Sequence, residues 1–180
     1  MIRLATRADL PKIAEIYEEI LNWEDAHTSH TNWQRGVYPT VVHAEGALKA
    51  GTLFVGEEEA GLWGTFILNQ VQLPEYEKIP WAYTAAPEEV WVIHTLCVPP
   101  SRTGKGRARM LVAFAEEYAR GRGGRVIRLD TYEGNHPALE MYPKLGYRRA
   151  GSALFHFMEM AVEVLVCFEK ALTAPEVDKN

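Results

Sequence analysis

The chain has 180 residues, of which 47% are hydrophobic, and a formal net charge of −5 at pH 7. This length and composition fit one globular domain with a full core, and we expect a single domain over residues 1–173 with a frayed tail over residues 174–180. The negative charge argues against a general nucleic-acid-binding protein.

The cysteines and the N-terminal residues indicate the cellular setting. Cys97 and Cys167 both lie in apolar, strand-like runs, which makes a disulfide framework improbable and favours a reducing cytoplasm. Cys and His lack the spacing of metal ligands. The first residues show no apolar signal core, and no stretch reaches the length that spans a bilayer. We therefore expect a soluble cytoplasmic protein without a metal, a nucleic-acid partner or a membrane partner.

The first half of the chain predicts one strand, two helices and two strands of an antiparallel hairpin. In chain order these elements span residues 2–5, 9–23, 41–50, 51–57 and 62–70. Thr6 and Asp9 resemble a capping arrangement at the start of the first helix.

Two connections in this half carry many aromatic or proline residues. The first, residues 22–40, contains Trp33 and Tyr38, which either wall a pocket or fill the core beside the first helix. The second, residues 73–89, contains three prolines and predicts a long irregular segment of the kind that is often functional or partly mobile.

The central stretch of the chain predicts a strand, a turn and a helix. Residues 90–98 form an apolar run rich in β-branched and aromatic side chains, typical of a strand buried on both faces. Apolar residues then recur with helical spacing from Ala108 onward, so the backbone N–H groups of residues 104–108 should open a helix and favour an anion. A nucleotide P-loop is excluded because Lys105 is followed by Gly106, not by Ser or Thr. The cationic side chains in and around this turn either meet a polyanionic cofactor or form a solvated helix face: Arg102, Lys105, Arg107 and Arg109.

The last third predicts a second strand that lies parallel to the central one, because a strand–helix–strand unit crosses over right-handedly. This strand spans residues 125–131, and a short helix follows between the cap residue Asn135 and Gly146. The final strands are expected at residues 147–150 and 162–170, joined by an irregular connection.

Two motifs with fixed spacing give the chain a family resemblance. In the first, a turn of the form Arg or Gln, two residues, Gly, one residue, Gly or Ala falls on Thr103, Gly106 and Ala108, with Thr103 departing from the pattern. The second motif is matched at all five of its positions: Asn135, Ala138, Tyr142, Gly146 and Tyr147. With this order of elements, the chain resembles the GCN5-related N-acetyltransferase (GNAT) family. The resemblance implies an α/β fold, three-layered α+β in detail, whose mixed, mostly antiparallel sheet of about six to seven strands has a splayed parallel pair and is flanked by helices.

The resemblance also implies an activity. Members of the family transfer an acetyl group from acetyl-coenzyme A to an amine, here expected to be a primary amine of a small molecule that attacks directly in a ternary complex. Tyr142 would be the general acid that protonates the leaving thiolate. For the general base the leading candidate is His94, which could equally be a hydrogen-bonded core residue; Glu133 and His136 are weaker alternatives.

Family motifs and their neighbourhood also assign binding residues. Those expected to contact the coenzyme are Leu96, Cys97, Val98, Thr103, Gly104, Lys105, Gly106, Arg107, Ala108, Asn135 and Tyr142. Those expected to contact the acceptor are Trp33, Tyr38, His94 and Phe157. Two alternatives stay open: a non-catalytic module that senses acetyl-coenzyme A, and an acyltransferase that uses another acyl-coenzyme A. A homodimer formed through the last strands or through residues 73–89 is also compatible with the sequence.

Overall fold

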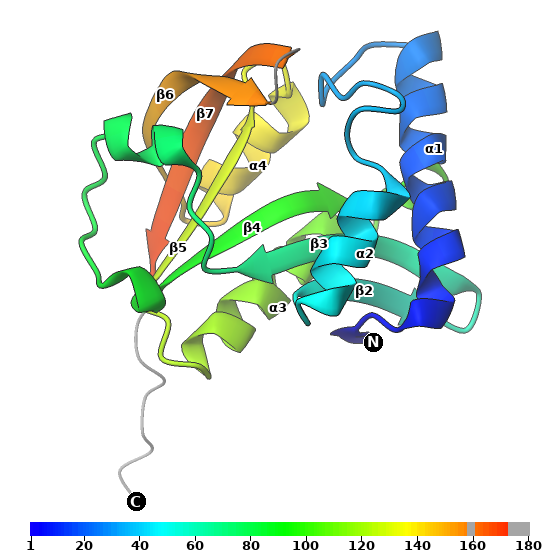
Figure 1. Cartoon of the computed structure of the whole chain (residues 1–180), viewed down its shortest axis with the longest axis horizontal. Coiled ribbons are helices and arrows are strands. Elements are labelled where there is room, and N and C mark those ends of the chain that lie inside the picture. The colour runs from blue at the N-terminus through cyan, green and yellow to red at the C-terminus, as the bar shows by residue number, and fades with distance from the viewer. Residues whose placement is uncertain (158–160, 173–180) are drawn as a thin grey trace, which may run out of the picture.

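A computed structural model of the protein describes residues 1–157 and 161–172. Its centre is a seven-stranded sheet with the order β1-β2-β3-β4-β5-β7-β6 (Figure 1). The strands are β1 Ile2–Leu4, β2 Leu53–Glu58, β3 Gly61–Asn69, β4 Val90–Cys97, β5 Val126–Tyr132, β6 Arg148–Phe157 and β7 Ala161–Ala171. The helices are α1 Leu10–Ala26, α2 Val41–Lys49, α3 Arg107–Arg120 and α4 His136–Lys144. β4 and β5 pair in parallel and the other described pairings are antiparallel, which confirms the predicted mixed sheet.

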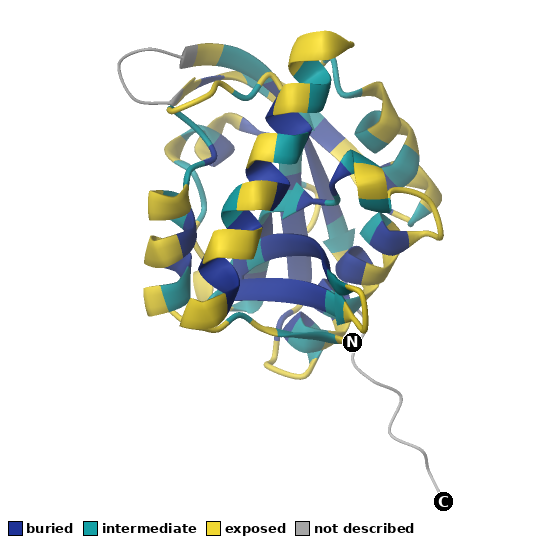
Figure 2. Cartoon of the chain, turned by 90° about the vertical axis from the view of Figure 1, so that its right-hand side faces the viewer, coloured by how far each residue is buried: buried dark blue, intermediate teal, exposed yellow. Residues whose placement is uncertain are grey.

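The helices cover both faces of the sheet and so build the core in two layers. α1 and α2 bury Ile13, Ile16 and Ala44 against one face, where Leu53 and Val55 of β2 meet them. α3 and α4 bury Leu111 and Tyr142 against the other face. Figure 2 shows the resulting alternation of buried and exposed residues along α1. Among the described helices, none is both long and apolar enough to cross a bilayer.

The predicted boundaries agree with the structure except near the C-terminus. The capping arrangement is present, with the Thr6 N–H donating to Asp9 Oδ2 at 2.7 Å. The prediction that the sixth strand ends at residue 150 was wrong, because β6 continues to Phe157 and pairs with β7 along this whole length. Gly151 marks a bulge and not an end: a Cβ there would lie 3.1 Å from Pro80 Cδ, so glycine lets residues 73–89 pack closely on the strand.

Residues 73–89 are anchored to the sheet. They form 3₁₀ turns at Pro74–Lys78 and Pro87–Glu89 and bury Tyr76 and Ile79. The fully buried Glu169 of β7 accepts the N–H groups of Ala82 and Tyr83 at 2.7 and 3.2 Å, and Arg148 donates to the same carboxylate at 2.7 Å. The buried Glu169 carboxylate therefore anchors the segment that carries Tyr76, whose hydroxyl donates to Asp130.

We predict that Glu169→Gln lowers the free energy of unfolding by about 2–3 kcal/mol, because an amide cannot accept both N–H groups and also neutralise Arg148. Denaturant unfolding measures this loss. Glu117→Gln is the matched control, because the Glu117 side chain is 74% exposed and pairs only at the surface with Arg120. Equal stability of the two variants would contradict the anchoring role of Glu169.

Candidate functional site

The site begins where the two parallel strands separate. β4 and β5 pair from Val90 opposite Val126 to Ile93 opposite Leu129, and no further pairing between them follows in the described strands. On its other edge β4 carries a bulge, since Thr65 of β3 pairs with Cys97 and Ile67 pairs with His94, which leaves two β4 residues opposite one of β3. Thr95 lies in this bulge with φ +50°, a left-handed conformation that turns the strand. The backbone of β4 thus leaves β5 and opens the sheet.

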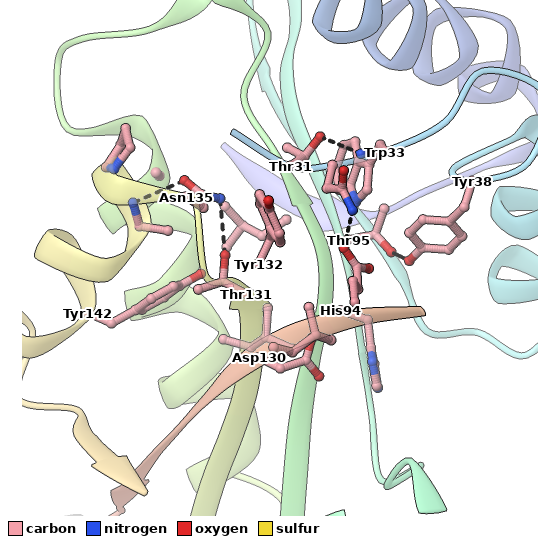
Figure 3. A pocket seen from close by; sticks show the side chains of 18 of the residues that line it. Thr31, Trp33, Tyr38, His94, Thr95, Asp130, Thr131, Tyr132, Asn135 and Tyr142 are labelled. Carbon is pink, nitrogen blue, oxygen red and sulfur yellow. Dashed lines mark hydrogen bonds between the residues drawn. The ribbon is translucent and has the colours of Figure 1, made fainter. Parts of the chain in front are cut away.

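A cavity of about 610 Å³ occupies this opening. Figure 3 shows side chains from β4, β5, α4 and the loop between α1 and α2 turned toward it. Nine of the predicted site residues line it: Trp33, Tyr38, His94, Leu96, Val98, Thr103, Ala108, Asn135 and Tyr142. Cys97 does not, because its side chain is buried on the opposite face of β4 with the residues of α1 and α2. The Phe157 side chain lies outside the described part of the structure.

The turn before α3 presents a row of free backbone donors at the edge of the cavity. Gly104, Lys105 and Gly106 have φ of +85°, +52° and +69°, so three successive residues take the left-handed conformation. The two glycines adopt it without strain. Within the described chain, no protein acceptor bonds to the N–H groups of Gly104, Lys105, Gly106, Ala108 and Arg109. The N–H groups of Thr103 and Arg107 are engaged, donating to Pro100 O and Gly104 O. Five free donors beside a helix N-terminus fit a pyrophosphate, whereas Thr103 and Arg107 have no N–H to offer it.

Two of the arginines in this region hold the turn in place. The Arg107 guanidinium is buried and donates to both Glu58 oxygens at 2.7 and 2.8 Å, with its carbon 5.5 Å from the centre of the Trp63 ring. Arg102 donates to Glu58 at 3.0 Å and to Ala60 O at 2.9 Å. These side chains connect the turn to the β2–β3 hairpin, while Lys105 and Arg109 remain exposed.

Tyr142 offers a free hydroxyl inside the cavity. The residue is only 6% exposed and packs against Tyr147 and Phe168, with ring centres 5.6 and 5.5 Å away. Among the described residues no acceptor bonds to its hydroxyl, which points into the cavity (Figure 3). Burial, and then the nearby charge of Asp130, raises the pKa of Tyr142 far above its usual value. At neutral pH the group is therefore a proton donor.

Asn135 lines the cavity and also caps α4. Its Oδ1 accepts the N–H of Ala138 at 3.3 Å, and its Nδ2 donates to Thr131 Oγ1 at 3.0 Å. These bonds account for its position at the start of the helix. One amide N–H remains for a ligand.

His94 has one ring nitrogen in a structural hydrogen bond. Nε2 lies 3.0 Å from Asn69 Oδ1, an oxygen that also accepts the N–H of Val71, so Nε2 carries the proton. A hydrogen bond to the Val71 backbone also engages the ring. In Figure 3 the imidazole extends toward the end of β3 and not toward Tyr142. Burial lowers the pKa of His94 to about 4, so the ring is neutral at pH 7.

Asp130 is a site residue that sequence reasoning missed. It lies on β5, lines the cavity, and accepts the Tyr76 hydroxyl on Oδ2 at 2.7 Å. Burial raises the pKa of Asp130 to about 6, against the lowering effect of the Tyr76 bond. The available signal was a carboxylate near the C-terminal end of the strand next to the central strand.

The loop between α1 and α2 closes the far wall. Tyr38 packs edge-on against Trp33 and His43, and its hydroxyl bonds to Thr95 Oγ1 in the bulge of β4. Trp33 also contacts the core cluster under α1. The loop therefore does both things that its aromatic residues predict: it walls a pocket and fills the core.

We predict that Arg107→Gln lowers the free energy of unfolding by about 2 kcal/mol and weakens coenzyme A binding, because the turn loses its link to Glu58. Thermal unfolding and calorimetric titration measure the two effects. Arg109→Gln, at an exposed position in the first turn of α3, is the control for stability. A stable Arg107→Gln variant with full coenzyme affinity would show that this link does not shape the donors.

Comparison with known proteins identifies relatives of this chain by sequence and by fold. A family model described as the acetyltransferase (GNAT) family matches residues 11–147. The chain is 32% identical over 101 residues to streptothricin acetyltransferase of Escherichia coli, a match that covers 56% of this chain and 55% of that protein. It therefore spans about half the length of that curated relative.

Two solved structures share the fold of this chain. A putative acetyltransferase from Staphylococcus aureus Mu50 is 26% identical, with a TM-score of 0.72 over 96% of this chain and 99% of that one. The structure of yncA, a putative acetyltransferase from Salmonella typhimurium with its cofactor acetyl-CoA, is 21% identical and shares the fold, with a TM-score of 0.66 over 96% of this chain and 94% of that one. Since the family model covers most of the chain, this protein belongs to the GNAT family of acetyltransferases.

Proposed function

We propose that this protein is an N-acetyltransferase that moves an acetyl group from acetyl-coenzyme A to the primary amine of a small molecule, by direct attack in a ternary complex. One observation carries the proposal: the free backbone donors of residues 104–106, 108 and 109 and the unpartnered Tyr142 hydroxyl flank the same opening between β4 and β5. Membership of the GNAT family supports acyl transfer, and the Salmonella relative with acetyl-CoA supports the donor.

The residues present fit coenzyme A. The N–H groups of Gly104, Lys105, Gly106 and Ala108 would hold its pyrophosphate, which needs donors and a helix N-terminus more than side-chain charge. Leu96 and Val98 line the cavity on the part of β4 that β5 no longer covers. Free strand edges accept extended amide chains, so this stretch would bind the pantetheine arm. When bound, the coenzyme supplies an acetyl thioester to the cavity.

The protein side of the reaction needs two further groups. A backbone N–H of residues 96–98 would donate to the carbonyl oxygen as negative charge develops on it. Tyr142 would donate its proton to the sulfur that leaves, a role for which a buried, protonated and unpartnered hydroxyl is suited.

The attacking amine must lose a proton, and two side chains of the cavity can accept it. His94 is bound to Asn69 through Nε2, and a hydrogen bond to the Val71 backbone also engages its ring. Asp130 has a free Oδ1, and its charge is close enough to raise the pKa of Tyr142. We favour Asp130, because its pKa of about 6 leaves it ionised at neutral pH and still able to take a proton.

We predict that Tyr142→Phe lowers kcat about ten- to a hundredfold, with little change in the affinity for acetyl-coenzyme A, because the variant loses only the proton donor. Release of free thiol with a panel of amines measures kcat, and calorimetry measures affinity. Tyr147→Phe is the matched control, since Tyr147 packs on Tyr142 but does not line the cavity. If the wild-type protein binds acetyl-coenzyme A but releases no thiol with any amine, the proposed enzymatic activity is overturned. The alternative of a non-catalytic module that senses acetyl-coenzyme A would then remain.

The pH dependence of kcat at saturating amine separates the two proton acceptors. The acceptor must be deprotonated to act, so activity falls as the pH drops through its pKa. With Asp130 in this role we expect the acid limb near pH 6 and its loss in Asp130→Asn; with His94 the limb would lie near pH 4 and be lost in His94→Gln. A limb that survives both substitutions would exclude both residues.

A further inference from the structure

The cavity carries uncompensated negative charge. Asp130 and Glu163 line it, and within the described chain no Lys or Arg does. Of the three lining histidines, burial lowers the pKa of His43 and His94, so both stay neutral at pH 7. The third, His156, lies 3.7 Å from Glu75 and faces that carboxylate. A ligand that fills the cavity therefore meets two acids and no fixed cation.

The two acids lie on one face of the sheet and are separated along it. Asp130 of β5 is opposite Cys167 of β7, and Glu163 is four residues further along β7. Side chains alternate between the faces, so Asp130, Cys167 and Glu163 point to the same side. At about 3.3 Å per residue, four residues amount to roughly 13 Å along the strand, within which the side chains can converge.

Each acid has one oxygen fixed by the protein and one left free. Tyr76 donates to Oδ2 of Asp130, and Asn32 donates to Oε2 of Glu163 at 2.9 Å. No described donor bonds to Asp130 Oδ1 or Glu163 Oε1. The loop that carries Asn32 is itself held by Glu24, which accepts the N–H groups of His30 and Thr31. The protein thus orients both carboxylates and leaves each an acceptor for a ligand.

A separate observation places the reacting end of the ligand. The Tyr142 hydroxyl, buried and unpartnered, points into the same cavity. The charge of Asp130 raises the pKa of Tyr142, whereas Glu163 is held by Asn32 in the loop between α1 and α2. Asp130 is therefore the acid beside the proton donor, and Glu163 the acid at the far end near the loop.

We propose, building on the acetyl transfer proposed above, that the acceptor is an amine with a second positive charge and no carboxylate. Its reacting ammonium lies at Asp130, and its second cation lies at Glu163. An acceptor with a carboxylate, such as an ordinary amino acid, would bring a third anion into a cavity without a cation. A neutral tail would leave the free oxygen of Glu163 unpaired.

Three probes of matched length test this acceptor class: 1,6-diaminohexane, hexylamine and 6-aminohexanoate, with acetyl-coenzyme A as donor and thiol release as readout. We expect kcat/KM to be about tenfold or more higher for the diamine than for hexylamine, and lowest for 6-aminohexanoate. A homologous series from 1,3-diaminopropane to 1,8-diaminooctane then finds the spacing that spans the two acids.

Variants of Glu163 assign the second charge. Glu163→Gln should remove most of the preference for the diamine over hexylamine, and Glu163→Lys should reverse it in favour of 6-aminohexanoate. Asn32→Ala should raise KM for the diamine more than it lowers kcat, because it frees the carboxylate without removing it. Glu140→Gln removes the same charge at an exposed position on α4, and this variant should keep the preference for the diamine. Thermal unfolding of each variant verifies that it is folded.

Outcomes separate this acceptor class from the reaction itself. Thiol release at equal kcat/KM for the three probes, or a diamine preference that persists in Glu163→Lys, overturns the dicationic acceptor and leaves acetyl transfer intact. Calorimetric binding of the diamine that weakens in Glu163→Gln, without thiol release from any probe, supports the acceptor site and overturns the transfer. If the diamine neither binds nor is turned over, the dicationic acceptor class is overturned.

Discussion

The early separation of β4 from β5 is the constraint on which the site depends. Parallel pairing stops at Ile93 and Leu129, and the bulge at Thr95 turns the rest of β4 away. A continuous pair of strands would fill the space with backbone hydrogen bonds, and α3 and α4 would begin against a closed sheet. Because the strands diverge, the cavity lies between them, with the free donors before α3 at one side and Tyr142 of α4 at another. Tyr38 supports the bulge from the opposite wall through Thr95.

Charge is divided between the two parts of this opening. At the end proposed for the coenzyme, the attraction would come from backbone N–H groups, because Arg102 and Arg107 bind Glu58 and hold the turn. This explains how Thr103 can replace the family's Arg or Gln: the turn needs its backbone geometry, and Thr103 contributes by bonding to Pro100 O. At the end proposed for the acceptor, the charge is negative, from Asp130 and Glu163. In the proposed reaction, an anionic donor and a cationic acceptor would thus be drawn to opposite ends of one cavity.

Local patterns predicted the fold and several of the residues that line the cavity. Apolar runs, helix caps and glycines predict the individual strands and helices. The spacing from Asn135 to Tyr147 identifies the family and Tyr142. The missed features depend on contacts distant in sequence. Gly151 looks like a strand end until Pro80 is seen packed on it. Asp130 looks like a strand residue until Tyr76, 54 positions away, is seen donating to it. Arg107 looks like a coenzyme ligand until Glu58 is seen beneath it.

The central claim is that free backbone N–H groups before α3 capture the pyrophosphate of acetyl-coenzyme A. An amide-resolved NMR titration tests it most directly, with acetyl-coenzyme A compared with acetyl-pantetheine, which lacks the pyrophosphate. The account predicts that the N–H resonances of Gly104, Lys105, Gly106, Ala108 and Arg109 shift strongly with the full coenzyme and little with the truncated one, and that those of Thr103 and Arg107 shift less. Equal shifts with both ligands, or shifts confined to other segments, would contradict the claim.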